Sequence, residues 1–194
     1  NIFKILSGFL IILLPINQLI GNNWPAWRGA DATGSITGKN YPSELNLNKN
    51  LIWKSPLPGK GCSTPIVWED SILLTCPVNG KDTVLSFSMS GSKKWETEIG
   101  PEQKGRHLNG SGSNPSVTTD GTNLYALFKS GNLAALGING DVLWQNNLQQ
   151  SYGKLKLYWD QGTSPALTKR DVIVAVMHGG DSYVVAFDQR TGKQ

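Results

Sequence analysis

The sequence has few charged residues and very few of the side chains from which metal and redox sites are built. Charged residues make up 16% of the 194 positions, and there are only two cysteines and two histidines. Such low charge is unlike a long helical or coiled-coil protein. The cysteines are not adjacent, no Cys-x-x-Cys-His haem-attachment motif occurs, and neither histidine has a partner at metal-ligand spacing. We therefore predict no bound cofactor.

Clusters of basic residues are also missing. The net charge is +4, from 18 Lys and Arg against 14 Asp and Glu, yet no run of Lys and Arg is longer than two. A nucleic-acid partner usually requires a clustered basic face, so we predict none. The hydrophobic content of 39% is too high for a disordered chain, and 22 glycines are too many for a helical bundle.

The N-terminus carries a short apolar segment. Residues 5–16 read ILSGFLIILLPI and follow Lys4. About a dozen apolar residues suit a signal peptide and fall short of the roughly 20 that a bilayer span needs. We predict a signal peptide at 1–21 and an exported protein, periplasmic or secreted in a bacterium. An uncleaved anchor remains the alternative, and membrane contact is expected only through this segment.

The rest of the chain contains short β-rich runs separated by Gly, Asn and Asp turns, which predicts an all-β meander. The runs repeat with a period of about fifty residues. The positions that hold register are prolines before the first strand, glycines at a later turn, and tryptophans four residues after two of those glycines. They are Pro65, Pro115 and Pro165; Gly91, Gly140 and Gly192; Trp95 and Trp144.

This period is typical of a β-propeller built from four-stranded antiparallel blades. We predict an N-terminal extension at 22–61, in which Trp53 marks a closing outer strand, and blades at about 62–100, 113–148 and 162–194. A tryptophan repeated once per blade can wedge between neighbouring sheets. The chain begins with Asn1 and ends inside the third repeat, so we expect about three blades of an incomplete ring.

At this point the sequence resembles a family, the quinoprotein-type or PQQ-repeat β-propellers. Their blades carry a pattern like A-x-D-x-x-T-G-x-x-x-W, and residues 186–192 read AFDQRTG, with Asp188 at its acidic position. Residues 24–29, WPAWRG, are similar to the segment that opens many exported bacterial members. The resemblance covers about residues 23–194 and implies the fold. The superfamily contains both quinone-dependent dehydrogenases and non-enzymatic relatives similar to the assembly propeller BamB.

The dehydrogenase branch implies pyrroloquinoline quinone, a Ca²⁺ ion with oxygen ligands, a carboxylate base and often a disulfide between adjacent cysteines. No adjacent cysteines occur here. The aspartates of the repeat, Asp120, Asp171 and Asp188, fall at turns or strand ends, where turn chemistry explains them.

Two loops contain candidate binding residues. His107 lies in a polar loop before the second blade and either faces a ligand or is simply solvated. Tyr152, Tyr158 and Trp159 lie between the second and third blades, beside Lys154 and Lys156. They form either a binding surface for a protein or polysaccharide or a packing contact onto the rim.

Cys62 and Cys76 flank the first hairpin. With a turn at Glu69-Asp70, facing residue numbers sum to about 139, so the two cysteines lie within one residue of direct opposition. An exported protein can keep a disulfide, but an offset of one residue can place side chains on opposite faces of a sheet. A disulfide and two unpaired thiols both remain open.

Two functions follow. The first is an exported, non-catalytic binding or assembly scaffold that contacts a protein or polysaccharide at its propeller face. The alternative is a PQQ-dependent alcohol or sugar dehydrogenase whose catalytic residues lie in missing blades, and it rests on the resemblance alone.

Overall fold

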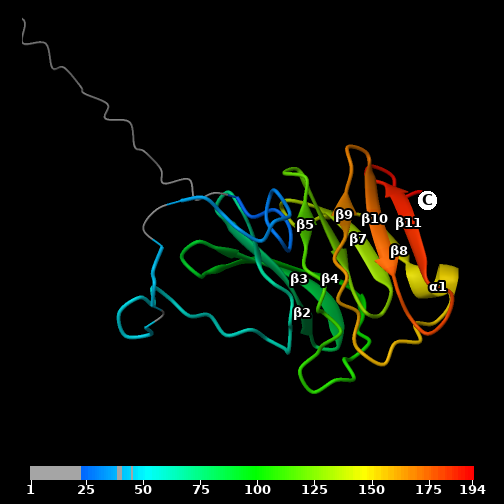
Figure 1. The fold of residues 1–194 in the computed structure, drawn as a ribbon, viewed down its shortest axis with the longest axis horizontal. Helices are drawn as coiled ribbons and strands as arrows, with labels where there is room; N and C mark the ends of the chain where they lie inside the picture. Colours follow the sequence, from blue (N-terminus) through cyan, green and yellow to red (C-terminus); the bar gives the residue numbers. More distant parts are fainter. Residues whose placement is uncertain (1–22, 39–40, 45) are drawn as a thin grey trace, which may run out of the picture.

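Three antiparallel sheets follow one another along the chain in the computed structural model, which describes residues 23–38, 41–44 and 46–194 (Figure 1). The first blade contains β1 (Ile66–Trp68), β2 (Ser71–Val78), β3 (Lys81–Ser88) and β4 (Lys93–Pro101). The second contains β5 (Thr118–Thr119), β6 (Asn123–Leu127), β7 (Asn132–Gly137) and β8 (Val142–Asn147). The third contains β9 (Ala166–Leu167), β10 (Asp171–Val176) and β11 (Tyr183–Asp188). Strands pair in chain order, so each blade is a meander.

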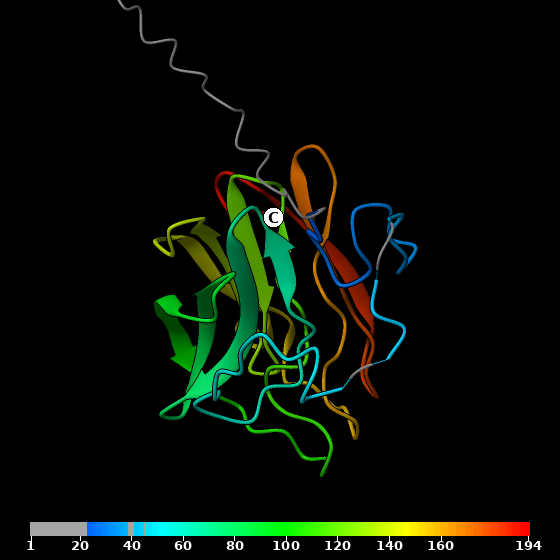
Figure 2. The same cartoon turned by 90° about the vertical axis from the view of Figure 1, so that its left-hand side faces the viewer.

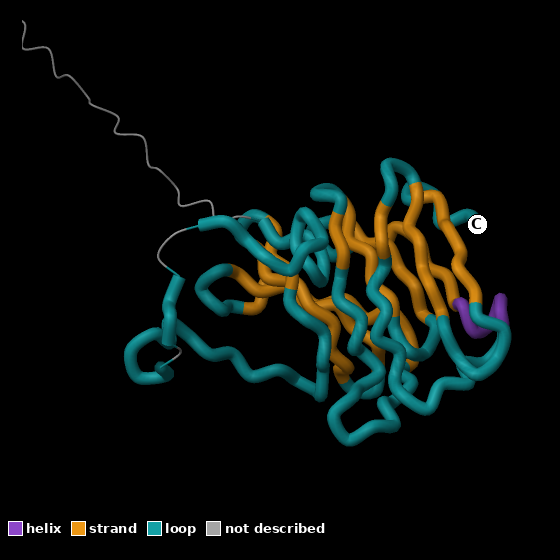
Figure 3. The backbone as a smooth tube through the Cα atoms, viewed as in Figure 1, coloured by secondary structure: helices purple, strands orange, loops and turns teal. Residues whose placement is uncertain are grey.

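The predicted fold class is confirmed: the chain is all-β, with propeller blades that do not close a ring. Figures 1 and 2 show the sheets fanning out side by side, and Figure 3 shows one short helix, α1 (Leu148–Tyr152), at the edge. The sequence analysis did not anticipate α1. No helix among the described residues is long and apolar enough to span a bilayer. The predicted signal peptide, 1–21, lies outside the described residues.

Local turn chemistry explains the hairpins. Asn79 and Gly80 both adopt positive φ, of 50° and 76°, which is what a two-residue type I′ hairpin turn requires. In the first hairpin Ile66 pairs with Leu73 and Trp68 with Ser71, which is the register predicted from the sequence.

The middle blade is buried on both faces. Along β6, Leu124 and Ala126 pack toward the first blade, whereas Tyr125 and Leu127 pack toward the third. Alternating side chains of one strand thus contribute to two cores, as the period of two in a strand dictates. This arrangement explains why β6 and β7 consist almost entirely of apolar residues although they belong to a small sheet.

The repeated tryptophans form the contacts between blades. Trp95 lies in β4, the outermost strand of its blade, and its indole covers the turn at Gly140 in the next blade. Trp144 in β8 covers Gly192 in the same way. A Cβ at Gly140 or Gly192 would come within 2.8 Å or 2.7 Å of indole carbon Cδ2. A glycine is therefore required at each turn, where φ is also positive.

Trp53 repeats this contact on the first blade, where it covers Gly91 and its Nε1 donates a hydrogen bond to the Met89 carbonyl at 2.8 Å. The residue two positions after each tryptophan donates to the carbonyl of the covered glycine. These bonds are Ser55 to Gly91 at 2.6 Å, Thr97 to Gly140 at 2.7 Å and Asn146 to Gly192 at 2.8 Å. The segment around Trp53 is not part of a strand in this incomplete ring, and the closing outer strand of the complete ring stays a prediction.

The aspartates of the repeat serve the turns. Asp188 Oδ1 accepts hydrogen bonds from the backbone N–H groups of Arg190 and Thr191, which close the turn after β11. Asp120 does the same for Thr122 and Asn123.

The two ends of the blades differ. The N-terminal segment lies at the upper end in Figure 1, where Trp24 forms a bridge to Val67 and the Pro25 carbonyl accepts from the backbone N–H of Thr119. The long connections at 102–117 and 153–165 project from the lower end. We call this lower end the loop face.

Candidate functional site

A buried ion pair holds the two long connections of the loop face together. Lys129, in the turn between β6 and β7, places its Nζ 2.5 Å from Asp160 Oδ1, and the two side chains are only 5% and 2% exposed. Lys129 also donates to the Lys104 carbonyl at 2.9 Å. Asp160 accepts further hydrogen bonds from the backbone N–H groups of Arg106 and His107. Together the two side chains hold residues 104–107 of the first connection against Asp160 of the second.

The electrostatics of Asp160 follow from these contacts. Burial raises the pKa of its carboxyl, but the hydrogen bond from Lys129, the two backbone donors and the Lys129 charge together lower it below 3.8. The carboxylate form is thus favoured in the folded protein. Its contribution to stability is present above about pH 4 and is lost as the pH falls through the folded pKa.

Three of the four aromatic or imidazole residues predicted as binding residues contact one another beside the Lys129–Asp160 pair. The His107 and Trp159 rings have centroids 4.9 Å apart, and Tyr158 and Trp159 form an edge-on pair at 5.0 Å. Trp159 is 59% exposed and Tyr158 is 75% exposed. The His107 Nδ1 accepts a hydrogen bond from the backbone N–H of Asn109, which orients the ring. We call His107, Tyr158 and Trp159 the aromatic cluster.

Tyr152 lies elsewhere. It belongs to α1, its ring packs on Tyr183 with a centroid separation of 4.6 Å, and its hydroxyl donates to Gln194 Oε1 at 2.6 Å. This residue packs a connection against the third blade, which is the packing alternative of the sequence analysis.

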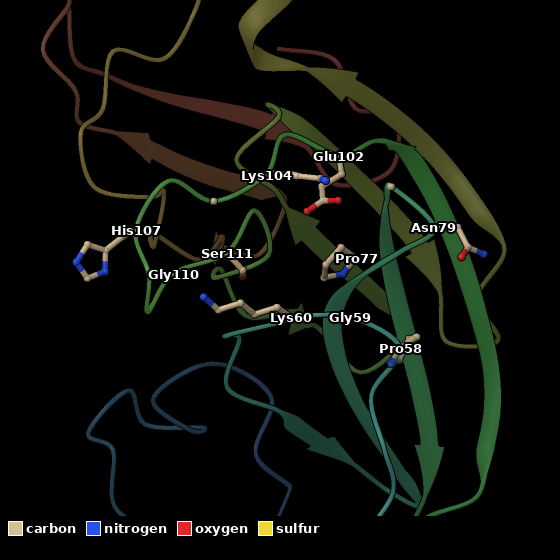
Figure 4. A pocket seen from close by; sticks show the side chains of 12 residues that line it. Pro58, Gly59, Lys60, Pro77, Asn79, Glu102, Lys104, His107, Gly110 and Ser111 are labelled. Carbon is tan, nitrogen blue, oxygen red and sulfur yellow. The ribbon is translucent and has the colours of Figure 1, made fainter.

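A pocket of about 430 Å³ lies beside the aromatic cluster and shares His107 with it. Its lining combines a carboxylate, two ammonium groups and small or polar residues of the first blade and of the 102–117 connection. Figure 4 shows Glu102 and Lys60 reaching into the pocket from different sides, with the His107 ring at its edge. Lys60 Nζ donates to the Leu108 carbonyl, which links the segment before β1 to the 102–117 connection. Lys60 and Lys104 were not among the binding residues predicted from the sequence.

A second buried carboxyl, Asp82, lies at the junction of the first and second blades. Its Oδ2 accepts from Ser130 Oγ at 2.5 Å and Asn132 Nδ2 at 2.9 Å, whereas Oδ1 has no protein partner. Burial raises the pKa of Asp82 to about 6, against a partial lowering by these two hydrogen bonds, and nearby Glu102 adds to the rise. Folding therefore favours the protonated form relative to the unfolded chain, so the contribution to stability is complete below about pH 3.8 and is lost as the pH rises through about 6.

The disulfide considered from the sequence does not form: Cys62 and Cys76 are both free thiols. The register was right, but β1 begins only at Ile66, and Ser63 bonds Thr75 through its side chain instead of the backbone ladder. The Cys62 N–H turns to the Ser113 carbonyl of the neighbouring connection. Cys62 is exposed, and its thiol donates to the Asn109 carbonyl, whereas buried Cys76 donates to Gly59.

The donor set does not fit a quinone and Ca²⁺ site in this part of the chain. No group of three or more His, Cys, Asp and Glu that could hold a metal ion occurs among the described residues. Asp120 and Asp188 use their oxygens in turns, and Asp160 is already paired with Lys129. We therefore derive no chemical step through these groups.

Comparison with known families agrees with this architecture. The family model for the outer membrane protein assembly factor BamB matches residues 43–194, which include all three blades and both connections of the loop face. The chain belongs to this family of PQQ-repeat β-propellers. No curated protein sequence matches the chain.

Solved structures of low identity share the fold. Quinohemoprotein alcohol dehydrogenase from Comamonas testosteroni is 17% identical with a TM-score of 0.61, over 92% of this chain and 27% of that one. A europium-containing methanol dehydrogenase is 14% identical with a TM-score of 0.60, over 89% and 31%. BamB from Moraxella catarrhalis is 18% identical with a TM-score of 0.52, over 73% and 40%. The chain thus spans less than half the length of each.

Proposed function

We propose that this protein is an exported binding scaffold that recognises a protein partner through the aromatic cluster on its loop face. The observation that carries the proposal is the exposure of Tyr158 and Trp159 on top of a buried Lys129–Asp160 pair. Tyrosine and tryptophan are enriched at protein interfaces and dominate their energetics.

The support beneath the cluster matters as much as its exposure. Binding orders side chains and loops, and a surface that is already ordered loses less conformational entropy. Here the His107 backbone N–H is bound to Asp160, and the neighbouring Trp159 ring packs on His107. The aromatic rings are therefore presented in one arrangement before a partner arrives.

A photo-crosslinking experiment in exporting cells tests the proposal. A benzoylphenylalanine at Tyr158 should form a discrete crosslinked product that mass spectrometry identifies as a protein, and Trp159→Ala should remove it. The same probe at Met89, 53% exposed at the opposite end of the first blade, is the matched control. Equal crosslinking at both positions would refute a dedicated surface.

Export is part of the proposal, supported by the apolar segment at residues 5–16 and by the family. Alkaline phosphatase fused after Gln194 is active only outside the cytoplasm and should show activity. Deleting residues 5–16 should abolish that activity.

The dehydrogenase alternative has support only from shared fold, and it predicts a different result. Dye reduction with an alcohol or a sugar by the full-length protein, after addition of PQQ and Ca²⁺, would establish it. The scaffold proposal predicts no turnover in this assay.

A further inference from the structure

The loop face carries more positive than negative charge. Four exposed cations lie in its connections and a fifth, Lys60, lies in the segment before β1. None of them forms an ion pair among the residues that the structure describes: Lys60, Lys104, Arg106, Lys154 and Lys156. The acidic residues nearby are fewer, because Asp160 is already neutralised by Lys129. Glu102 in the pocket and exposed Asp181 remain.

The cations and the aromatic cluster form one continuous surface. Lys60, Lys104 and His107 all line the 430 Å³ pocket, and the His107 ring contacts Trp159. The backbone of Lys104 is fixed by the hydrogen bond from Lys129 to its carbonyl, so the buried pair that supports the aromatic rings also positions a lysine. A bound segment can therefore reach the lysines and the rings at the same time.

We propose that the partner presents an acidic peptide segment, whose carboxylates lie at Lys60 and Lys104 and whose apolar side chain packs on Tyr158 and Trp159. This inference rests on the proposed function and specifies its ligand. A volume of 430 Å³ is near the lower end of ordinary ligand sites, which suits one or two side chains. Complementary charge also speeds the encounter and selects among partners.

The Glu102 carboxylate in the pocket favours a ligand with widely spaced negative charges over one with a negative charge on every unit. Glu102 lines the same pocket as Lys60 and Lys104, on the Lys104 side in Figure 4, so a chain with a charge on every unit, such as a nucleic acid, brings like charges together there. A peptide can place carboxylates at the lysines and a neutral or amide group at Glu102. Lysine is a compact point charge with three donors and needs no bidentate partner, so a single carboxylate is sufficient.

Fluorescence anisotropy with three labelled peptides tests this on the whole chain. The acidic probe is Asp-Glu-Phe-Asp-Glu, the neutral isostere is Asn-Gln-Phe-Asn-Gln, and the third replaces phenylalanine by alanine in the acidic probe. We expect the acidic probe to bind about tenfold more tightly than the neutral one, an advantage of a few-fold per lysine contact. Raising the salt concentration should remove most of that advantage.

Matched variants separate the contribution of the two lysines from that of the aromatic cluster. Lys60→Gln with Lys104→Gln should reduce the affinity for the acidic probe to that for the neutral probe. Lys169→Gln with Lys193→Gln, which changes the net charge equally at the opposite end, should leave it unchanged. Trp159→Ala should weaken both phenylalanine peptides.

The outcomes are distinguishable. Equal affinity for acidic and neutral probes, or no binding of any probe below millimolar concentration, overturns the acidic-peptide inference. If the Trp159 dependence survives with equal affinities, the proposed function stands and only the ligand class fails; if Trp159→Ala changes nothing, both fail. Polygalacturonate that binds more tightly than the acidic probe, with the same lysine dependence, reassigns the site to an acidic polysaccharide and also overturns the inference.

Discussion

Replacing Gly140 with alanine tests the contact on which the stacking of the blades depends. Gly140 has φ of 95°, and an added Cβ would lie 2.8 Å from Trp95 Cδ2, 2.9 Å from Cε3 and 3.0 Å from Thr97 Oγ1. Real Cβ atoms do not approach aromatic carbons this closely, so the indole or the turn must move. The displacement also strains the hydrogen bond from Thr97 to the Gly140 carbonyl.

The expected loss of free energy of unfolding in Gly140→Ala has two parts. A non-glycine residue in the left-handed region costs about 1–2 kcal/mol wherever it occurs. Overpacking a filled contact costs a further 1–3 kcal/mol. Gly80 supplies the control, because it has φ of 76° but no atom within 4 Å of the added Cβ. Gly80→Ala should therefore lose only the first part, and Gly140→Ala both.

Urea denaturation followed by tryptophan fluorescence measures the difference between the two variants. We expect the Gly140→Ala midpoint to lie clearly below that of Gly80→Ala, with unchanged slope. Gly192→Ala should behave like Gly140→Ala, because Trp144 covers it in the same way. If Gly140→Ala and Gly80→Ala lose equal free energies of unfolding, the Trp95 indole does not hold the blades together. The spacing of tryptophan and glycine in the repeat would then not reflect a stabilising contact.

Three further predictions concern the ion pair, the Asp82 carboxyl and the two thiols. Asp160→Asn leaves the Lys129 ammonium buried without a counter-charge and should cost about 3–5 kcal/mol in urea denaturation; a loss below about 1 kcal/mol would contradict the structural role of the pair. The pKa of about 6 at Asp82 should stabilise the wild type by roughly 3 kcal/mol as the pH falls from above 6 to below 4, relative to Asp82→Asn. Denaturation midpoints of both proteins across this range check it, and parallel curves would show an ordinary pKa. Thiol titration of the unreduced, denatured protein should count two free thiols, and a count of zero would restore the disulfide between Cys62 and Cys76.

The features that the sequence predicted correctly are those that repeat. Trp95 and Trp144 each follow a glycine by four residues, and spacing of this kind is visible without coordinates. The register of the first hairpin was also predictable, because an acidic turn between two apolar runs determines which residues face each other. Whether Cys62 pairs with Cys76 was not predictable, because the backbone pairing of β1 and β2 stops at Ile66. Nothing in the sequence indicates that Ser63 bonds Thr75 through its side chain instead.

The candidate site was only partly predictable for a related reason. Tyr158 and Trp159 attract notice as aromatics in a long polar loop, but their partner His107 lies about fifty residues earlier and in a different connection. Lys129 and Asp160, which hold the connections together, belong to no motif and are 31 residues apart. Contacts between unlike loops depend on how neighbouring blades are placed, and only the folded chain supplies that information.

The buried Lys129–Asp160 pair supports the proposal that the loop face is a binding surface. Burying an ion pair is a weak route to stability, since desolvation offsets most of the attraction and apolar residues of the same volume often do as well. What apolar residues cannot do is accept hydrogen bonds from the backbone of another loop, and Asp160 accepts two while Lys129 donates to a third position. The pair therefore contributes geometry more than stability. That geometry positions Lys104 and His107 beside Trp159, whose ring remains 59% exposed.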